Sequence, residues 1–259
     1  MNCFNKAFVA ALVSLSVSTG ASNVLAKGDK GAGFHAEKTS VEAVSVEEVA
    51  AEVAETEVMI AENTSGSEIL DSNEITHLMF MREEEKLARD VYLTLGMLYP
   101  DLSIFGNIDD SEQRHTMAVK AMIEKYGYDD PNTNDNVGMY TGEDYGWYFT
   151  EKYNQLVERA KTSELEALYV GAFIEELDMM DINQCPKVIL ETDNGINDVT
   201  ECGKNYTDNP DIVKLYSSLI DGSISHLKGY VKNIEMNIGE GNYQAQVLGQ
   251  EEVDKLLGR

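Results

Sequence analysis

The chain has 259 residues and a formal net charge of -26. Such an excess of acidic groups argues against nucleic-acid phosphates and anionic membrane surfaces as partners, and it favours the attraction of cations. The length is enough for one well-formed hydrophobic core with additional segments.

Residues 1–26 have the organisation of a signal peptide. Lys6 supplies the positive charge, residues 7–17 form the apolar run, and Val24-Leu25-Ala26 fits a small-x-small cleavage site. The run is too short to span a bilayer, so a membrane anchor is the less favoured alternative. We therefore expect cleavage near Ala26, a secreted or periplasmic mature protein and no stable insertion into a membrane.

Residues 27–70 are predicted to form an acidic tether. Between residues 41 and 71 there are nine acidic residues, no Lys or Arg and no aromatic residue. Such a segment cannot bury enough apolar surface to fold alone. A helix that forms against a partner is the alternative. His35 lies in this tether and is assigned no role.

The cysteines fit an oxidising compartment. Cys3 is lost with the predicted signal peptide, and Cys185 and Cys202 remain as an even pair. A disulfide between them is the simplest interpretation, and two cysteines alone would make a poor metal site. We expect this disulfide to close an insert at residues 185–202.

Apolar residues at spacings of three and four predict four long helices in a folded domain at residues 71–237. The first two are expected at residues 71–98 and 103–126, and the third and fourth begin at Ser163 and at Asn209-Pro210, which are typical helix starts. A long crossover and a short helix at residues 147–161 separate the second helix from the third. Residues 238–259 are expected to form a C-terminal extension that packs on the outside.

Polar residues interrupt the apolar stripe of each predicted long helix. Glu112 and His115 are three residues apart, so they share one face of the second helix, between Ile108 and Val119. The corresponding residues on the first, third and fourth helices are Glu85, Glu175 and His226. An unpaired buried carboxylate or imidazole is costly, and a metal ion between facing helices removes that cost. Carboxylates combined with imidazoles suit Fe, Mn or Zn.

Each of these residues alone has a simpler explanation. A glutamate in a stripe can extend to solvent, a core histidine can bond a backbone carbonyl, and a single Glu-x-x-His motif is weak evidence. Inward polar positions on all four helices favour a shared site. Glu83 and Glu84 are expected to point more toward solvent, Glu84 less clearly so, and His77 near the start of the first helix is assigned no role.

Several segments together resemble a known family. They are MREEEKLARDVY at 81–92, SEQRH at 111–115, GAFIEELD at 171–178, DNPD at 208–211 and GSISH at 222–226. They are similar to the ferritin-like DUF2202 domain, a family of uncharacterised function, over about residues 70–236. The broader resemblance is to rubrerythrins and ferritins. It implies an all-α, ferritin-like antiparallel four-helix bundle with a long crossover between helices two and three.

The resemblance also implies roles for individual residues. Glu85, Glu112, His115, Glu175 and His226 correspond to metal ligands, and Tyr92, seven residues after Glu85, is expected beside the metal as a participant in catalysis. Rubrerythrins carry a second Glu-x-x-His on the fourth helix, whereas this chain has Ser223 at the glutamate position. Asp178 or Glu176 is the candidate replacement ligand; otherwise the second metal is weak or absent.

The leading functional hypothesis is an exported di-metal carboxylate protein. One or two divalent ions, Fe before Mn or Zn, would act with O2 or peroxide in a ferroxidase or peroxide-reducing oxidoreductase. The chain has no rubredoxin-like cysteine pairs, so electrons would come from another source. The alternatives are non-catalytic metal binding or sequestration at the cell envelope, and a helical interaction module without metal. A homodimer is a candidate assembly, and a cage like that of ferritin is not implied.

Overall fold

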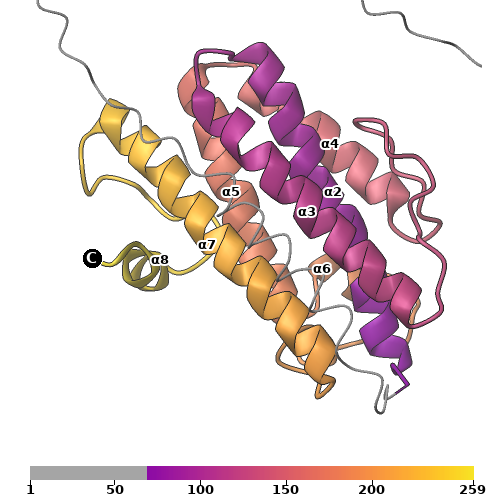
Figure 1. Ribbon diagram of the computed structural model, residues 1–259. Helices are drawn as coiled ribbons and strands as arrows, with labels where there is room; N and C mark the ends of the chain where they lie inside the picture. Colours follow the sequence, from indigo (N-terminus) through magenta and orange to yellow (C-terminus); the bar gives the residue numbers. More distant parts are fainter. Residues whose placement is uncertain (1–68) are drawn as a thin grey trace, which may run out of the picture. The chain divides into compact units, whose positions relative to one another are not determined.

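The computed structural model describes residues 69–259, which lie within a compact unit at Asn63–Arg259. These residues form seven helices and, within that range, no strand (Figure 1). The prediction of an all-α fold is therefore confirmed. None of the described helices is both long and apolar enough to cross a bilayer. The predicted signal peptide, most of the predicted tether and His35 lie outside the described residues.

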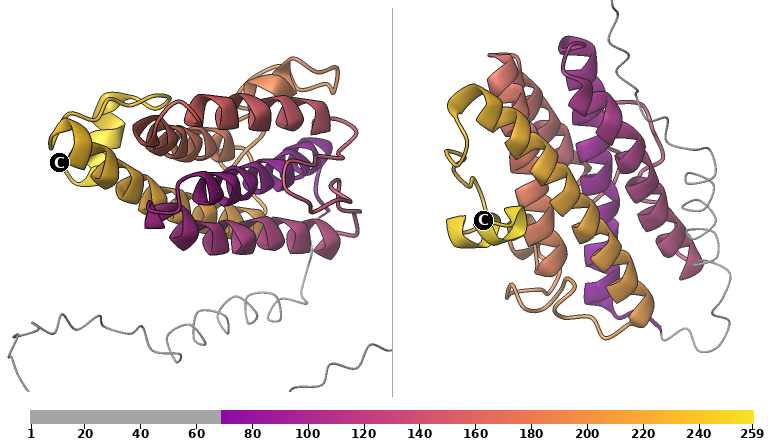
Figure 2. Two further views of the ribbon diagram at one scale, coloured as in Figure 1. Left: turned by 90° about the horizontal axis from the view of Figure 1, so that it is seen from above. Right: turned by 60° about the vertical axis from the view of Figure 1, so that its left-hand side comes forward.

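Four long helices lie side by side and position the site (Figures 1 and 2). They are α2 (Ser72–Leu98), α3 (Ser103–Lys125), α5 (Glu164–Asn183) and α7 (Pro210–Ile238). α2 packs on α3 and α5 packs on α7, while α3 also contacts α7 and α2 also contacts α5. Each long helix thus has two long neighbours, and the side chains that face inward from all four share one interior.

The helix starts follow from local capping chemistry. Asp71 accepts hydrogen bonds from the backbone of Asn73 and Glu74, and the Glu74 carboxylate accepts one from the Asp71 backbone. This reciprocal pair is a capping box, which satisfies two backbone N–H groups at the start of α2. At α7 the Asn209 side chain caps the first turn and Pro210 occupies it. The four residues between α2 and α3 leave room only for a tight reversal between these neighbours.

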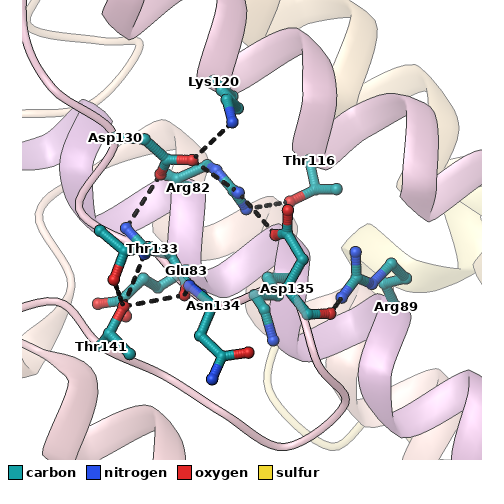
Figure 3. Close-up of polar contacts among 12 residues, drawn as sticks. Arg82, Glu83, Arg89, Thr116, Lys120, Asp130, Thr133, Asn134, Asp135 and Thr141 are labelled. Atoms are coloured by element: carbon teal, nitrogen blue, oxygen red, sulfur yellow. Dashed lines mark hydrogen bonds and ion pairs between the residues drawn. The ribbon is translucent and has the colours of Figure 1, made fainter. Parts of the chain in front are cut away.

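The crossover at residues 126–145 covers the outer side of α2 and leads into α4 (Gly146–Ala160), which contacts both α2 and α5. Figure 3 shows its main anchor, the buried guanidinium of Arg82. Arg82 donates to Thr116 Oγ1 at 2.6 Å, to Asp130 Oδ2 at 3.0 Å and to Asp135 Oδ1 at 3.2 Å. A buried charge requires such partners, and these contacts hold the crossover against α2 and α3.

The expectation that Glu83 and Glu84 point toward solvent is wrong. Their exposed fractions are 1% and 4%. Glu83 Oε1 accepts a hydrogen bond from the backbone N–H of Gly142 in the crossover, at 3.0 Å. The apolar periodicity of α2 identifies only the side that faces the other long helices. It does not indicate whether further segments cover the opposite side. Here the crossover and α4 bury the opposite side of α2 as well.

The insert after α5 is closed by a disulfide, as the sequence predicts. Cys185 and Cys202 are bonded with their Cα atoms 4.9 Å apart, and both are buried. The insert contains the short helix α6 (Lys187–Leu190). It also contacts the start of α2, where the Asn73 side chain donates to the Glu201 carbonyl at 2.9 Å. The disulfide therefore lies at the end of the helices where α2 begins.

The C-terminal segment packs on α5 and ends in α8 (Gln250–Leu257). Its attachment point is the buried carboxylate of Glu176, which accepts a hydrogen bond from Tyr243 Oη at 2.6 Å. The same carboxylate accepts three backbone N–H bonds, from Gln246, Val247 and Leu248, at 2.8, 2.6 and 3.0 Å. These four donors satisfy the buried charge and fix the segment to the outside of α5.

His77 is a structural core residue. It is fully buried, with Nε2 2.8 Å from the Asp181 carbonyl and Nδ1 2.7 Å from Tyr216 Oη. A carbonyl only accepts, so we assign the proton to Nε2, and Nδ1 accepts from the tyrosine. Burial lowers the pKa of His77 to about 4, although the backbone contacts of Asp181 and Gln184 act in the opposite direction. The histidine is therefore neutral in the folded protein at neutral pH.

This arrangement predicts that the protein loses stability as the pH falls from 6.5 to 4. In that window His77 takes up a proton in the unfolded chain but not in the folded one, so protonation favours unfolding. Above pH 6.5 His77 is neutral in both states and causes no loss of stability. Between pH 6.5 and pH 4 the free energy of unfolding falls by roughly 3 kcal/mol. Urea unfolding of the wild type and of His77→Gln at several pH values checks this. The variant should show a correspondingly flatter profile, and two parallel profiles would contradict it.

Candidate metal centre

Five of the predicted site residues meet between the four long helices. Their possible ligand atoms form two groups, Glu85 with Glu112 and His115, and Glu112 with Glu175 and His226. Within each group all these atoms lie within 4.8 Å of one another. α2, α3, α5 and α7 each contribute, and Glu112 belongs to both groups. We call these five residues the candidate centre.

The two carboxylate oxygens of Glu112 face different histidines. Oε2 is 3.1 Å from Nδ1 of His115, which is also 3.4 Å from Oε2 of Glu85. Oε1 is 2.8 Å from Nδ1 of His226, which is also 3.5 Å from Oε1 of Glu175. The two imidazole rings are 5.7 Å apart. Glu112 thus lies where one carboxylate could bridge two ions.

The centre is buried and incompletely satisfied by the protein. Glu85, Glu112 and Glu175 are buried, His226 is buried, and His115 is partly exposed. Among the described residues, Glu85 Oε1 has no hydrogen-bond partner. An unsatisfied carboxylate oxygen in the interior is costly. Glu85 Oε1 is therefore an acceptor atom that is free to bind a cation.

The five residues of the candidate centre set one another's charges by mutual contact. Burial raises the pKa of Glu112, but the imidazoles of His115 and His226 outweigh it and bring the value to about 2. Burial lowers the pKa of His226, but the carboxylates of Glu175 and Glu112 raise it to about 10. For His115, burial is likewise outweighed by Glu112 and Glu85, and its pKa is raised well above the ordinary value. Two imidazolium cations therefore partly neutralise the carboxylates.

The remaining two carboxylates keep protons more readily. Burial is the main cause that raises the pKa of Glu85 to about 7, and His115 opposes it. Burial also raises the pKa of Glu175, against the influence of His226. A cation at the centre would have to replace protons on both histidines and on Glu85.

Tyr92 lies against the centre, where the family resemblance places it. Its hydroxyl donates to Glu175 Oε1 at 2.5 Å, and its ring is 5.5 Å from that of Tyr230. The side chain is fully buried. Burial, with the nearby charge of Glu175, raises the pKa of Tyr92 well above its ordinary value. The neutral hydroxyl thus holds one oxygen of Glu175 in place.

The two proposed replacement ligands have other partners. Asp178 is buried and outside both groups, and its Oδ2 accepts a hydrogen bond from Ser223 Oγ at 2.5 Å. Glu176 is also outside both groups, because its carboxylate binds the C-terminal segment through four donors. Among the described residues the two groups therefore share Glu112 and include neither Asp178 nor Glu176.

A glycine on α7 makes room for His115, and sequence reasoning missed it. A Cβ atom at Gly222 would lie 2.4 Å from Cε1 and 2.6 Å from Nε2 of His115. The only sequence signal is a glycine inside an otherwise apolar helical pattern, which costs stability unless packing needs it. Gly222 thus allows α7 to approach the imidazole ring closely.

The chain belongs to the family described as "Uncharacterized protein domain (DUF2202)", which it matches over residues 74–258. It is 41% identical over 180 residues to the uncharacterized protein MJ0754 of Methanocaldococcus jannaschii, a match that covers 70% of this chain and 84% of that protein. The structure is similar to the crystal structure of hypothetical protein MJ0754 from Methanococcus jannaschii DSM 2661. That comparison gives a TM-score of 0.63 at 38% identity and covers 76% of this chain and 98% of that one.

Substitution of Gly222 tests the packing of the centre. We expect Gly222→Ala to destabilise the protein by about 1–3 kcal/mol, because the His115 ring must move. Gly229→Ala on the same helix is the matched control, since its Cβ would approach only Cδ1 of Ile104, at 3.3 Å. In the control, helix propensity should keep stability level or raise it by up to about 1 kcal/mol. Equal urea midpoints for the two variants would contradict the packing.

Proposed function

We propose that this protein is a di-metal carboxylate protein of the ferritin-like class, whose four long helices form an antiparallel four-helix bundle around two divalent ions. The observation that supports it most strongly is the position of Glu112. Its two oxygens face two separate groups, each with one further glutamate and one imidazole nitrogen. An inward Glu-x-x-His on facing helices is the arrangement used in di-iron and di-manganese bundles.

The residues fit such a pair of ions. One ion would be held by Glu85 and His115 with one oxygen of Glu112, and the other by Glu175 and His226 with the second oxygen. Oxygen and imidazole donors suit Fe, Mn or Zn. Two doubly charged ions would neutralise three carboxylates and leave both histidines neutral, which removes the cost of the buried charges.

We further propose an oxidoreductase that acts with O2 or peroxide, either as a ferroxidase or as a peroxide-reducing enzyme. A bound Fe or Mn pair would supply the electron-transfer chemistry. The chain's own residues would provide positioning: Tyr92 fixes Glu175 through its hydroxyl, and apolar burial keeps bulk water from the carboxylates. The partly exposed ring of His115 marks the side from which a small reactant could approach.

One observation favours a second candidate, binding or sequestration of metal without turnover. Ser223 occupies the position on α7 where rubrerythrins carry a glutamate, and its hydroxyl is bonded to Asp178. Glu112 alone would therefore bridge the ions. A centre with one bridging carboxylate has fewer anionic ligands to stabilise an oxidised metal pair. Metal binding without Fe(II) oxidation or peroxide consumption would support this candidate.

We also propose that the protein is exported. The sequence of residues 1–26 and a disulfide that suits an oxidising compartment support this location.

Removal of the shared carboxylate should weaken both ions at once. We expect the wild type, purified without chelator, to hold up to two equivalents of Fe or Mn, and Glu112→Gln to bind each ion at least about tenfold more weakly. Glu124→Gln, an exposed position near the end of the same helix, is the matched control. Elemental analysis with equilibrium titration measures this. Equal metal content in both variants, or a wild type without metal and with a melting temperature insensitive to EDTA, would contradict the proposal.

Metal affinity should rise with pH. His226, with a pKa of about 10, and His115 are protonated in the metal-free centre at neutral pH, and each must lose its proton to bind. Each ion therefore competes with at least one proton, and its affinity should increase about tenfold per pH unit between pH 6 and 8. Mn²⁺ titrations followed by electron paramagnetic resonance measure the slope. An affinity that is constant over this range would exclude the two histidines as ligands.

A further inference from the structure

A second group of acidic side chains is buried beside the candidate centre. It consists of Glu84 on α2 with Asp178 and Asp181 on α5, whose exposed fractions are 4%, 6% and 3%. Asp178 feels the charges of Glu85, Glu175 and Glu112, and Glu84 feels those of Asp181, Asp178 and Glu85. Buried carboxylates thus extend from the candidate centre toward α4.

A small cavity lies against two of these residues, Glu84 and Asp178. Its volume is about 10 Å³, close to what a single water molecule or a bare ion needs. Glu84, Asp178, Lys152 and Tyr148 supply its polar lining, and the remaining wall is apolar. Tyr148 and Lys152 belong to α4 and are only partly buried, so the cavity adjoins the protein surface on that side.

Two of the carboxylates in the cavity wall are incompletely bonded. Among residues 69–259, Glu84 Oε2 and Asp178 Oδ1 have no hydrogen-bond partner. The other oxygen of Asp178 is bonded to Ser223, and the Glu84 carboxyl contacts that of Asp181. Two residues that line one cavity of atomic size thus each have a buried oxygen without a partner, which is costly. A cation between them would remove this cost.

The protein supplies little positive charge here. Lys152 acts on Asp181 and lies over the Tyr148 ring, with Nζ 5.3 Å from its centroid. Lys152 faces three buried carboxyl groups, and Asp178 also interacts with Glu85, Glu175 and Glu112 of the candidate centre, whose charge His115 and His226 partly neutralise. Among the residues that line the cavity, acidic side chains therefore outnumber basic ones.

We propose that Glu84 and Asp178 bind a divalent cation in this cavity and form a transit site through which metal passes from solvent to the candidate centre. Oxygen-only ligands suit Mn²⁺, Fe²⁺ or Mg²⁺. Two protein oxygens hold an ion more weakly than the three ligands of each group at the centre, which suits passage and not storage. The role in transit rests on the proposed function, whereas the binding of a cation at Glu84 and Asp178 does not.

Anomalous diffraction from crystals of the protein grown with Mn²⁺ tests the site directly. The wild type should show peaks at the candidate centre and a weaker peak between Glu84 and Asp178. Glu84→Gln should lose that weaker peak and keep the others. Glu83→Gln is the matched control, because it removes a buried carboxylate from the adjacent position of α2, outside the cavity lining, and should keep all the peaks.

The possible maps separate this proposal from the proposed function. Peaks at the centre with none in the cavity, or cavity density without an anomalous signal, as an ordered water gives, would overturn the transit site and leave the centre intact. A cavity peak that persists in Glu84→Gln would also overturn it. A cavity peak with none at the centre would preserve the cation site but overturn both the transit role and the proposed function.

The transit role has a kinetic test. Co²⁺ uptake by the metal-free protein, followed by visible absorbance in a stopped-flow instrument, should be about tenfold slower in Glu84→Gln and in Asp178→Asn than in the wild type. The final number of ions at the centre should be the same, and Glu83→Gln should load at the wild-type rate. Unchanged loading rates in both cavity variants would overturn the transit role even if the cavity binds Mn²⁺.

Discussion

Burial of carboxylate charge where four helices meet is the constraint on which the rest of this structure depends. Glu85, Glu112 and Glu175 come from three helices, and two histidines lie within about ion-pair distance of them. Removing such charges from water is far more costly than a typical folding free energy can tolerate without compensation. In the metal-free chain protons on His115 and His226 supply part of that compensation, and divalent ions would supply more.

The same constraint explains the packing around the centre. Tyr92 holds Glu175, Ser223 holds Asp178, and Gly222 allows α7 to approach His115. On the opposite side of α2, Arg82 binds the acidic crossover, as Figure 3 shows. α2 is therefore enclosed on both sides, and its charged residues are ordered by partners from the crossover and the other helices. Such a helix can hold the candidate ligands in fixed positions.

Sequence reasoning located the helices and the five residues of the centre because both are encoded locally. Caps mark the helix starts, and a polar residue in an apolar stripe marks an inward position whatever its partner is. The partners themselves are not local. No local pattern indicates that Glu176 is bound by backbone groups some seventy residues later, or that the crossover buries Glu83. Whether an acidic side chain next to a ligand is itself a ligand depends on such distant segments.

The central claim is that two ions share Glu112, and X-ray absorption spectroscopy of the Fe- or Mn-loaded protein tests it most directly. The account predicts a mixed shell of oxygen and nitrogen neighbours and a metal–metal distance of about 3.5–4 Å, as in other two-metal sites. A metal–metal scatterer that disappears in Glu112→Gln would agree with it. A loaded protein without any metal–metal contribution, or with a shell that lacks imidazole nitrogen, would contradict it.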